Sequence, residues 1–318
     1  MDTTDSNQQW ERRVLEKLAF AALKEQRTKR RWGIFFRLAV LAYLVAVLFL
    51  VVDWGAPEKL ADDKHTALIN LRGTIDATGE ISGDKVNAAL QMAFKDKGTA
   101  GVVLRINSPG GSPVQAGMVY DEIRRLRKKY PEIPLYVVVE DICASGGYYI
   151  AAAADKIYVD KASMVGSIGV LMNGFGFTGT MEKLGVERRL LTAGANKGFL
   201  DPFSPQDDTQ KEHANRLLEQ VHQQFIDVVR KGRGERLKEN PDIFSGLIWT
   251  GSQSVEMGLA DGYGTVDSVA REVIKVEDVV DFSVKENIAE RFAKKIGAEA
   301  GAALSTRLLG NSEQPALR

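Results

Sequence analysis

The sequence predicts an α/β fold with a mostly parallel sheet, preceded by one N-terminal transmembrane helix. Short apolar runs alternate with longer amphipathic runs in units of about 30 residues, which is typical of strands joined by crossover helices. Glycine turns follow two of the strand-like runs. Near the N-terminus, an apolar run of 19 residues is interrupted only by Arg37.

The N-terminal apolar run, residues 34–52, is long enough as a helix to cross a hydrocarbon layer of about 30 Å. Trp32 and Trp54 bracket it as interfacial anchors do. Cations are unequal on its two sides: Lys17, Lys24, Arg27, Lys29, Arg30 and Arg31 precede it, and Lys59 and Lys64 follow it. The positive-inside rule therefore predicts a cytoplasmic tail at 1–32, a span at 33–54 and a large domain outside the cytoplasm.

A cleaved signal peptide is the alternative interpretation of this run. Its charged region would be unusually long, and residues 53–57 offer no good pair of small residues and place a proline where cleavage would fall. We therefore expect an uncleaved single-pass anchor.

A charged linker at 55–66 leads into the main domain, which we expect at residues 67–280. Its strand runs are rich in leucine, isoleucine and valine, and its helix runs repeat apolar residues every three to four positions. The expected elements are strands at 68–75, 102–106, 135–139 and 156–159, helices at 84–95 and 114–129, and a helix that Ser145 opens.

The second half of the domain is less regular. Residues 188–191 form a strand-like run, and residues 205–231 form the longest soluble helix, acidic near its start and basic at its end. The segment 248–251 and a short helix before Gly258 follow. From 281 to 318 apolar residues recur at multiples of four, which predicts an amphipathic and flexible tail.

Ser145 stands where a strand gives way to a helix. Two glycines follow it, and helix N-termini present unpaired backbone amides, so a substrate carbonyl could approach this serine closely. A second glycine turn, residues 107–112, follows the preceding strand and offers another oxyanion donor. The pattern favours acyl transfer, although serine before a helix is most often only an N-cap. Cys143, two residues earlier, is expected to be a small buried apolar residue.

A nucleophilic serine needs a base, and the three histidines are poorly placed to supply it. His65 precedes the first strand, and His213 and His222 lie on the long polar helix. Lysine is the better candidate, provided that burial or a neighbouring cation makes it lose its proton readily. Lys197 lies in a glycine-rich segment, although a lone lysine in a loop is usually only solvated.

Four motifs in order resemble the bacterial signal peptide peptidase A family of Ser/Lys proteases. They are SPGGS at 108–112, ASGGYY at 144–149, GSIGV at 166–170, and Lys197 after Gly194. The separation of 52 residues between Ser145 and Lys197 also resembles that of the short, single-domain members. The similarity runs from about residue 67 to 274.

The resemblance implies a role for each matching residue. Ser145 would be the nucleophile, Lys197 the general base, and Ser167 the residue that orients Lys197. The alternative for Ser167 is that it only caps a turn. The oxyanion donors would be amides of Gly110 or Gly111, with Gly146.

The resemblance also implies the fold and the setting. The fold would be the crotonase-like fold shared with Clp proteases, and the protein would be a serine endopeptidase in the bacterial inner membrane, with its catalytic domain periplasmic. Its substrates would be remnant signal peptides and other short apolar peptides. Homo-oligomeric rings, often octameric, would complete each active site between subunits.

Composition narrows the other possibilities. Lys and Arg number 42, as do Asp and Glu, so no basic field favours nucleic acid. One cysteine excludes an internal disulfide, and no paired Cys/His spacing suggests zinc, so we expect no metal and no cofactor. Two alternatives remain open: a crotonase-type acyl-thioester enzyme, which would need neither Ser145 nor Lys197, and a non-catalytic membrane scaffold.

Overall fold

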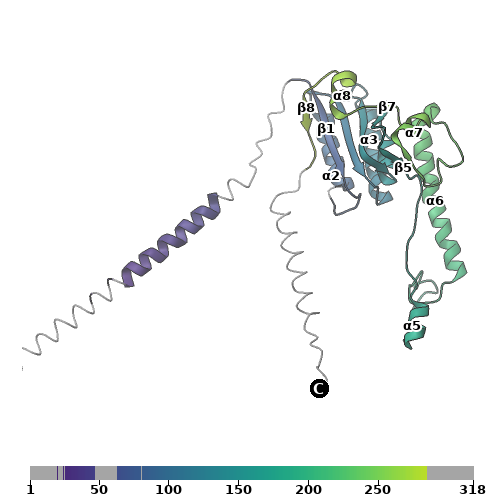
Figure 1. Ribbon diagram of the computed structural model, residues 1–318, viewed down its shortest axis with the longest axis horizontal. Coiled ribbons are helices and arrows are strands. Elements are labelled where there is room, and N and C mark those ends of the chain that lie inside the picture. Colours follow the sequence, from purple (N-terminus) through teal and green to yellow (C-terminus); the bar gives the residue numbers. More distant parts are fainter. Residues whose placement is uncertain (1–19, 21–23, 25, 47–62, 80, 285–318) are drawn as a thin grey trace, which may run out of the picture. The chain divides into compact units, whose positions relative to one another are not determined.

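The computed structural model describes residues 20, 24, 26–46, 63–79 and 81–284, and the chain divides into two compact units. One unit is Leu60–Glu286. In the other, residues 26–46 form a helix (Figure 1). The predicted span at 33–54 runs on beyond the described residues, as do parts of the predicted tails and linker. Among the described residues, no helix combines the length and apolarity needed to cross a membrane.

Eight strands form one sheet in the larger unit, in the order β6-β5-β3-β2-β1-β8, with β4 paired to β3 and β7. Of the ladders between described strands, only β5–β6 is antiparallel. The strands are β1 His65–Arg72, β2 Thr99–Ser108, β3 Leu135–Ala144, β4 Lys156–Val159, β5 Met164–Gly166, β6 Ile248–Thr250, β7 Gly262–Tyr263 and β8 Val279–Asp281. The predicted α/β class with a mostly parallel sheet is confirmed, and it fits a Clp-protease-like fold.

The helices connect the parallel strands. They are α2 Gly83–Lys95, α3 Pro113–Lys129, α4 Gly146–Ala151, α5 Thr178–Leu184, α6 Asp208–Arg233, α7 Gly251–Glu256 and α8 Val266–Ser268, with single turns η1 Gly234–Arg236 and η2 Val269–Ile274. Local sequence explains two of the starts. Ser82 caps α2 and Ser112 caps α3, and Pro113 occupies the first position of α3, where its missing N–H costs nothing.

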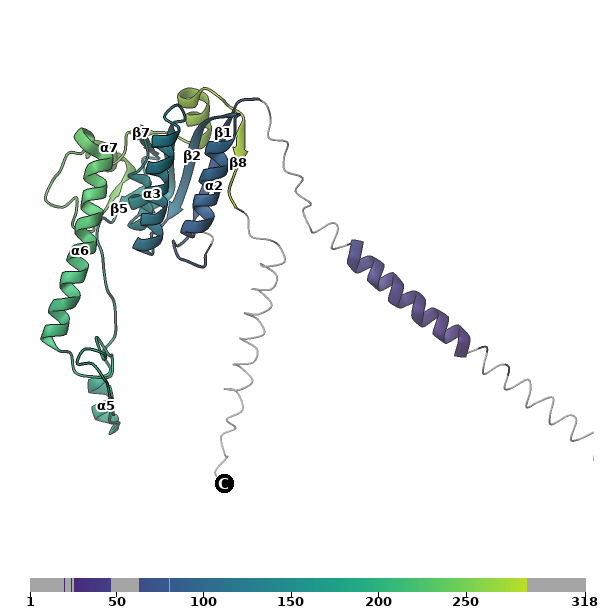
Figure 2. The ribbon, with the colours of Figure 1, turned by 180° about the vertical axis from the view of Figure 1, so that it is seen from behind.

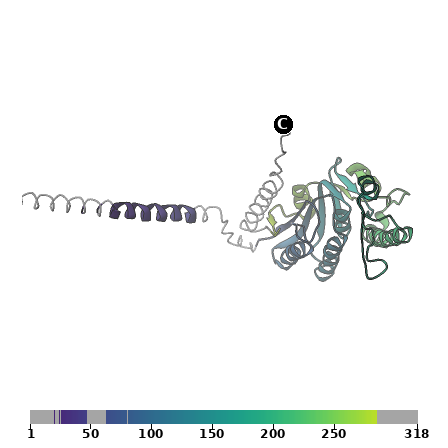
Figure 3. The same cartoon turned by 90° about the horizontal axis from the view of Figure 1, so that it is seen from below.

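The strands bury side chains on both faces of the sheet because successive residues point to opposite sides. On one face, Ile69, Leu104 and Val137 join the main core with α2 and α3. On the other, Leu68 and Val103 belong to a smaller cluster covered by η2. Figure 3 shows α2 and α3 together on one side of the sheet.

Two predictions about strands were wrong. Residues 188–191 form no strand, because they are exposed and no described strand pairs with them. The first strand begins at His65 and ends at Arg72, before Gly73 turns the chain at φ +102°. Ile75, predicted inside that strand, instead forms isolated bridges beyond it.

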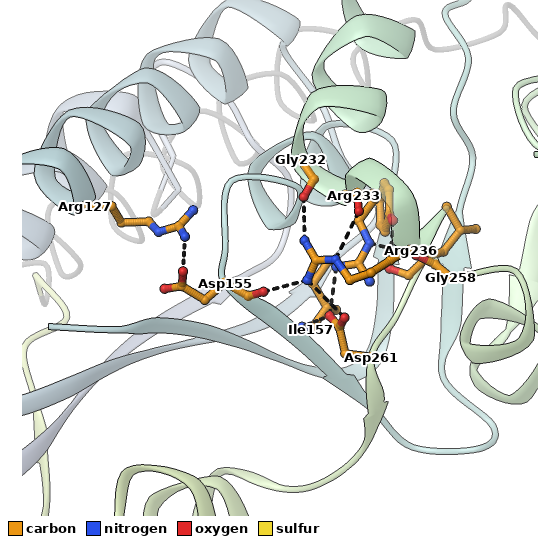
Figure 4. A network of polar contacts seen from close by, with 10 residues as sticks. Arg127, Asp155, Ile157, Gly232, Arg233, Arg236, Gly258 and Asp261 are labelled. Atoms are coloured by element: carbon orange, nitrogen blue, oxygen red, sulfur yellow. Dashed lines mark hydrogen bonds and ion pairs between the residues drawn. The ribbon is translucent and has the colours of Figure 1, made fainter. Parts of the chain in front are cut away.

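A buried charge network joins the end of α6 to β4 and β7 (Figure 4). Arg233, only 1% exposed, donates to Asp261 Oδ2 at 2.8 Å and to Gly258 O at 2.8 Å, and Arg236 donates to Asp261 Oδ1 at 3.1 Å. Burial raises the pKa of Asp261, but the Arg233 hydrogen bond and the nearby charges outweigh it, so the pKa lies below its ordinary value of 3.8. The stabilisation from this carboxylate is therefore complete above that value and is lost as pH falls through the lowered pKa.

Arg233→Met should lower the free energy of unfolding by about 3 kcal/mol, because Asp261 loses its buried partner while Arg236 still offsets part of its charge. Denaturant unfolding of the full chain in detergent, followed by tryptophan fluorescence, measures this. As a control, Arg216→Ala removes an exposed pair with Glu212 and should cost less than about 1 kcal/mol. Equal losses in both variants would contradict a stabilising role for the network.

Candidate active site

Ser145 occupies the tight turn between β3 and α4. Its φ of +51° and ψ of −121° are costly for a residue with a side chain and persist only where neighbouring contacts hold them. The Ser145 N–H donates to Gly166 O at 2.9 Å, and its C=O accepts from Tyr149 N–H at 2.9 Å. The hydroxyl makes no capping hydrogen bond to α4. The alternative of a simple N-cap is therefore wrong for Ser145.

The glycine turn after β2 lies directly against Ser145. A methyl group built on Gly110 would fall 2.7 Å from Ser145 Cβ and 2.8 Å from Gly146 N, and one built on Gly146 would fall 3.4 Å from Gly111 N. The Gly110 N–H already donates to Ser108 Oγ at 3.2 Å. The Gly111 and Gly146 amides, in contrast, donate to no described residue. Two unpaired amides therefore lie side by side next to the Ser145 hydroxyl.

Ser167 leaves the strand next to that of Ser145. The register pairs Ala144 with Gly166, so the two serines follow neighbouring strand ends. Ser167 also has φ +51°, and its N–H donates to Leu247 O at 2.7 Å. Its hydroxyl bonds to none of the described residues, so the alternative of a turn cap finds no support in these contacts.

A cavity of about 600 Å³ joins these groups. Its walls are three serines, four glycines, and mainly apolar side chains from α3, α4, α6 and the chain after β5. They comprise Gly111, Pro113, Ser145, Gly146, Tyr149, Ser167, Gly169, Val170, Leu171, Val221, Gln224, Phe225, Ser245 and Gly246. The lining residues of α6 and residues 245–246 were not predicted to belong to the site, because their local sequence is that of an ordinary helix face and an ordinary loop.

Lys197 lies away from this cavity. It belongs to residues 171–207, here called the arm, which contains α5 and folds against the start of α6. The Phe199 ring meets the His213 ring at 5.7 Å between centroids, and the Leu200 N–H donates to Gln210 Oε1 at 3.2 Å. In Figures 1 and 2, α5 and the first part of α6 extend beyond the sheet.

The separation can be estimated along α6. From His213 to Val221 and Phe225, which line the cavity, is about 12–18 Å at 1.5 Å per residue. Lys197 is exposed, does not line the cavity and forms no ion pair among the described residues. The structure thus brings together Ser145, Ser167, Gly111 and Gly146, and leaves Lys197 of the same chain apart.

None of the three histidines lines the cavity. His65 is buried beside Thr99 at the start of β1, with 3.3 Å between His65 Nε2 and Thr99 Oγ1. His222 lies closest to the site in its contacts, because its Nε2 is 3.2 Å from Ile168 O, next to Ser167. It braces the Ser167 turn through the backbone.

Cys143 is fully buried in β3 and belongs to the main core. Burial raises the pKa of its thiol above the ordinary value, which keeps it protonated and unreactive. The prediction of a small buried apolar residue is confirmed, although Cys143 stands two residues from Ser145.

Comparison with known proteins identifies the family. Residues 127–280 match Peptidase family S49. A protein of Enterococcus faecium named "Putative signal peptide peptidase SppA" is 31% identical over 237 residues, 72% of this chain and 68% of that protein. "Probable protease SohB" of Haemophilus influenzae is 29% identical over 250 residues, 76% of this chain and 67% of that protein.

A third relative is similar over a shorter stretch. "Na(+)/H(+) antiporter NhaA" of Brucella abortus is 47% identical over 182 residues, which are 57% of this chain but 25% of that protein. The chain thus spans about a quarter of this relative. Since the chain covers two thirds of the SppA relative above 30% identity, and Ser145, Ser167 and Lys197 all lie within the matched S49 segment, it belongs to Peptidase family S49, the signal peptide peptidase A family.

Proposed function

We propose that this protein is a membrane-anchored serine endopeptidase that uses a Ser145/Lys197 dyad. The observation that carries the proposal is the Ser145 turn. A strained backbone presents a hydroxyl that caps nothing, beside two amides without partners, at the wall of a cavity. A protease that forms an acyl-enzyme needs this combination of nucleophile and oxyanion donors, whereas an acyl-thioester enzyme would not need the serine.

In this proposal the reaction proceeds through an acyl-enzyme. The general base removes the Ser145 proton while Ser145 Oγ bonds to the scissile carbonyl carbon, and the carbonyl electron pair moves to the oxygen. The Gly111 and Gly146 amides stabilise that oxyanion. The C–N bond then breaks as the amine takes the proton, and water releases the acyl group from Ser145. No metal or cofactor takes part in these steps.

A neighbouring subunit would supply the base. A base must lie within hydrogen-bond reach of the proton it removes, about 2.6–3.2 Å, and Lys197 of the same chain is far from Ser145. The arm that carries Lys197 has a surface suited to contact with another subunit. Its exposed apolar residues include Leu171, Met172, Phe175, Leu184, Val186 and Leu191. We infer a closed ring of identical subunits, in which Ser167 orients the incoming Lys197.

The cavity is suited to apolar peptides in extended form. Val170, Leu171, Val221 and Phe225 provide apolar walls next to the nucleophile. Together with the name of the Enterococcus faecium relative, this supports remnant signal peptides and other short apolar peptides as substrates.

A serine-directed covalent probe tests the proposal. The full chain in detergent should hydrolyse a fluorogenic apolar peptide, and a fluorophosphonate should block hydrolysis and add its mass to the peptide that contains Ser145. Ser204→Ala, which removes a hydroxyl paired with Asp201 on the arm, should be labelled as wild type. No hydrolysis and no label on Ser145 would refute the proposal and leave the scaffold alternative.

The anchor has a separate test. Because cations crowd the N-terminal side of residues 34–52, reporter fusions should be cytoplasmic before Trp32 and extracytoplasmic after Trp54. A mature protein that begins near Ala56 would show instead that the segment is a removed signal peptide.

A further inference from the structure

Ser108 is a buried hydroxyl to which the proposed mechanism gives no part. It ends β2 and is 0% exposed. Its O–H donates to Gly73 O at 2.6 Å, and its Oγ accepts the Gly110 N–H at 3.2 Å. One side chain therefore ties the turn after β1 to the glycine turn that faces Ser145.

The glycine turn is fixed through its two peptide planes. Ser108 holds the plane that contains the Gly110 N–H. The next plane contains the Gly110 C=O and the Gly111 N–H, and the Ile75 N–H binds that C=O at 2.9 Å. In a planar trans peptide the C=O and N–H point in opposite directions. Holding the Gly110 C=O toward Ile75 therefore turns the Gly111 N–H away from Ile75.

The turn has little other freedom. Gly110 has φ +102° and Gly111 has φ +147°, and a methyl group on Gly111 would lie 2.1 Å from Ile75 O. Ser108 also packs under α4, since a methyl group on Gly147 would lie 3.2 Å from Ser108 O. The Ser108 hydroxyl is the side-chain part of a clamp whose other contacts come from the backbone.

We propose that Ser108 is a positioning residue that holds the Gly111 N–H in place as an oxyanion donor. It touches neither the substrate nor Ser145, and acts through the Gly110 peptide. This inference rests on the proposed function and deepens it. A loosened donor weakens binding of the transition state more than binding of the substrate, so the variant should lose kcat rather than gain KM.

Ser163 provides a matched control. It is 2% exposed, its Oγ donates to Glu140 O, and it accepts the Asp160 N–H at 3.0 Å. It thus makes the same pair of backbone contacts as Ser108, but outside the cavity wall. Ser108→Ala and Ser163→Ala each remove two hydrogen bonds between a buried hydroxyl and the backbone, so both should lower the Tm by a few degrees.

The two variants should differ in catalysis. With the full chain in detergent, well below both Tm values, Ser108→Ala should lower kcat by about 10²-fold with KM within a factor of two, as expected when a donor is misplaced. Ser163→Ala should keep both constants. A peptide aldehyde, which forms an oxyanion on reaction with Ser145, should bind Ser108→Ala more weakly by a factor similar to the loss in kcat/KM.

Equal kcat in the two variants, or a rise in KM at unchanged kcat, would overturn the role of Ser108 while wild-type hydrolysis still supports the proposed function. An inactive wild type would instead reject the proposed function itself. If Ser108→Ala does not fold, Ser108→Cys keeps a weak donor and acceptor in the same place and should still show a lower kcat than Ser163→Cys.

Discussion

Ser145→Ala should abolish peptide hydrolysis, with kcat lower by about 10⁶-fold, because Ser145 is the one serine of the cavity wall that directly precedes a proposed oxyanion donor, Gly146. The variant should remain folded. Alanine fills the same space, and the Ser145 N–H and C=O, which hold the turn, are retained. Hydrolysis of a fluorogenic apolar peptide, with the Tm as a check on folding, measures this. Residual turnover within tenfold of wild type would remove Ser145 from the mechanism.

Lys197→Ala should be as inactive as Ser145→Ala. Lys183→Ala is the matched control, because Lys183 is an exposed lysine on the same arm, and it should keep near wild-type turnover. His213→Ala should also leave turnover nearly intact, and His222→Ala, which removes only a contact to the Ile168 carbonyl, should keep most of it. A folded histidine variant as inactive as Ser145→Ala would overturn the dyad.

The regular half of the fold could be predicted because its signals are local. Strand and helix runs up to residue 159 have clear periodicity, and caps such as Ser82 and Ser112 mark where the helices begin. The strands β5 to β8 have two or three residues each and carry no periodicity. Their existence depends on the neighbours that pair with them. The converse error, at residues 188–191, arose because a strand-like run without a pairing partner does not become a strand.

The candidate site could be predicted where parallel strands end. Ser108, Ser145 and Ser167 follow or end neighbouring strands, so that one edge of the sheet gathers turns that lie far apart in the sequence. Which glycine amide is unpaired could not be predicted, because that depends on the Ser108 hydroxyl and the Ile75 backbone. The distance of Lys197 from Ser145 in one chain likewise depends on how the arm packs along α6.

That distance makes assembly part of the chemistry we propose. If each site draws Ser145 from one subunit and Lys197 from the next, dilution below the dissociation constant of the assembly should silence the enzyme while each domain remains folded. The loss should be reversible on concentration. Analytical ultracentrifugation follows the dissociation of the assembly. Turnover that stays proportional to subunit concentration while the assembly dissociates would contradict the dependence of activity on assembly.

Mixing two inactive variants gives the larger effect and the sharper test. A Lys197→Ala subunit still offers Ser145, and a Ser145→Ala subunit still offers Lys197. In randomly co-assembled rings, roughly a quarter of the sites should combine both intact residues, so turnover should rise from background to about a quarter of the wild-type value. A mixture of Ser145→Ala with the double variant serves as the control and should stay inactive, because no subunit in it carries Ser145.

If both residues acted within one chain, every site in the first mixture would carry a defect. Mass spectrometry verifies co-assembly. If turnover then does not recover, both residues of the dyad act within a single subunit, and the arm would have to move to bring Lys197 to its own Ser145.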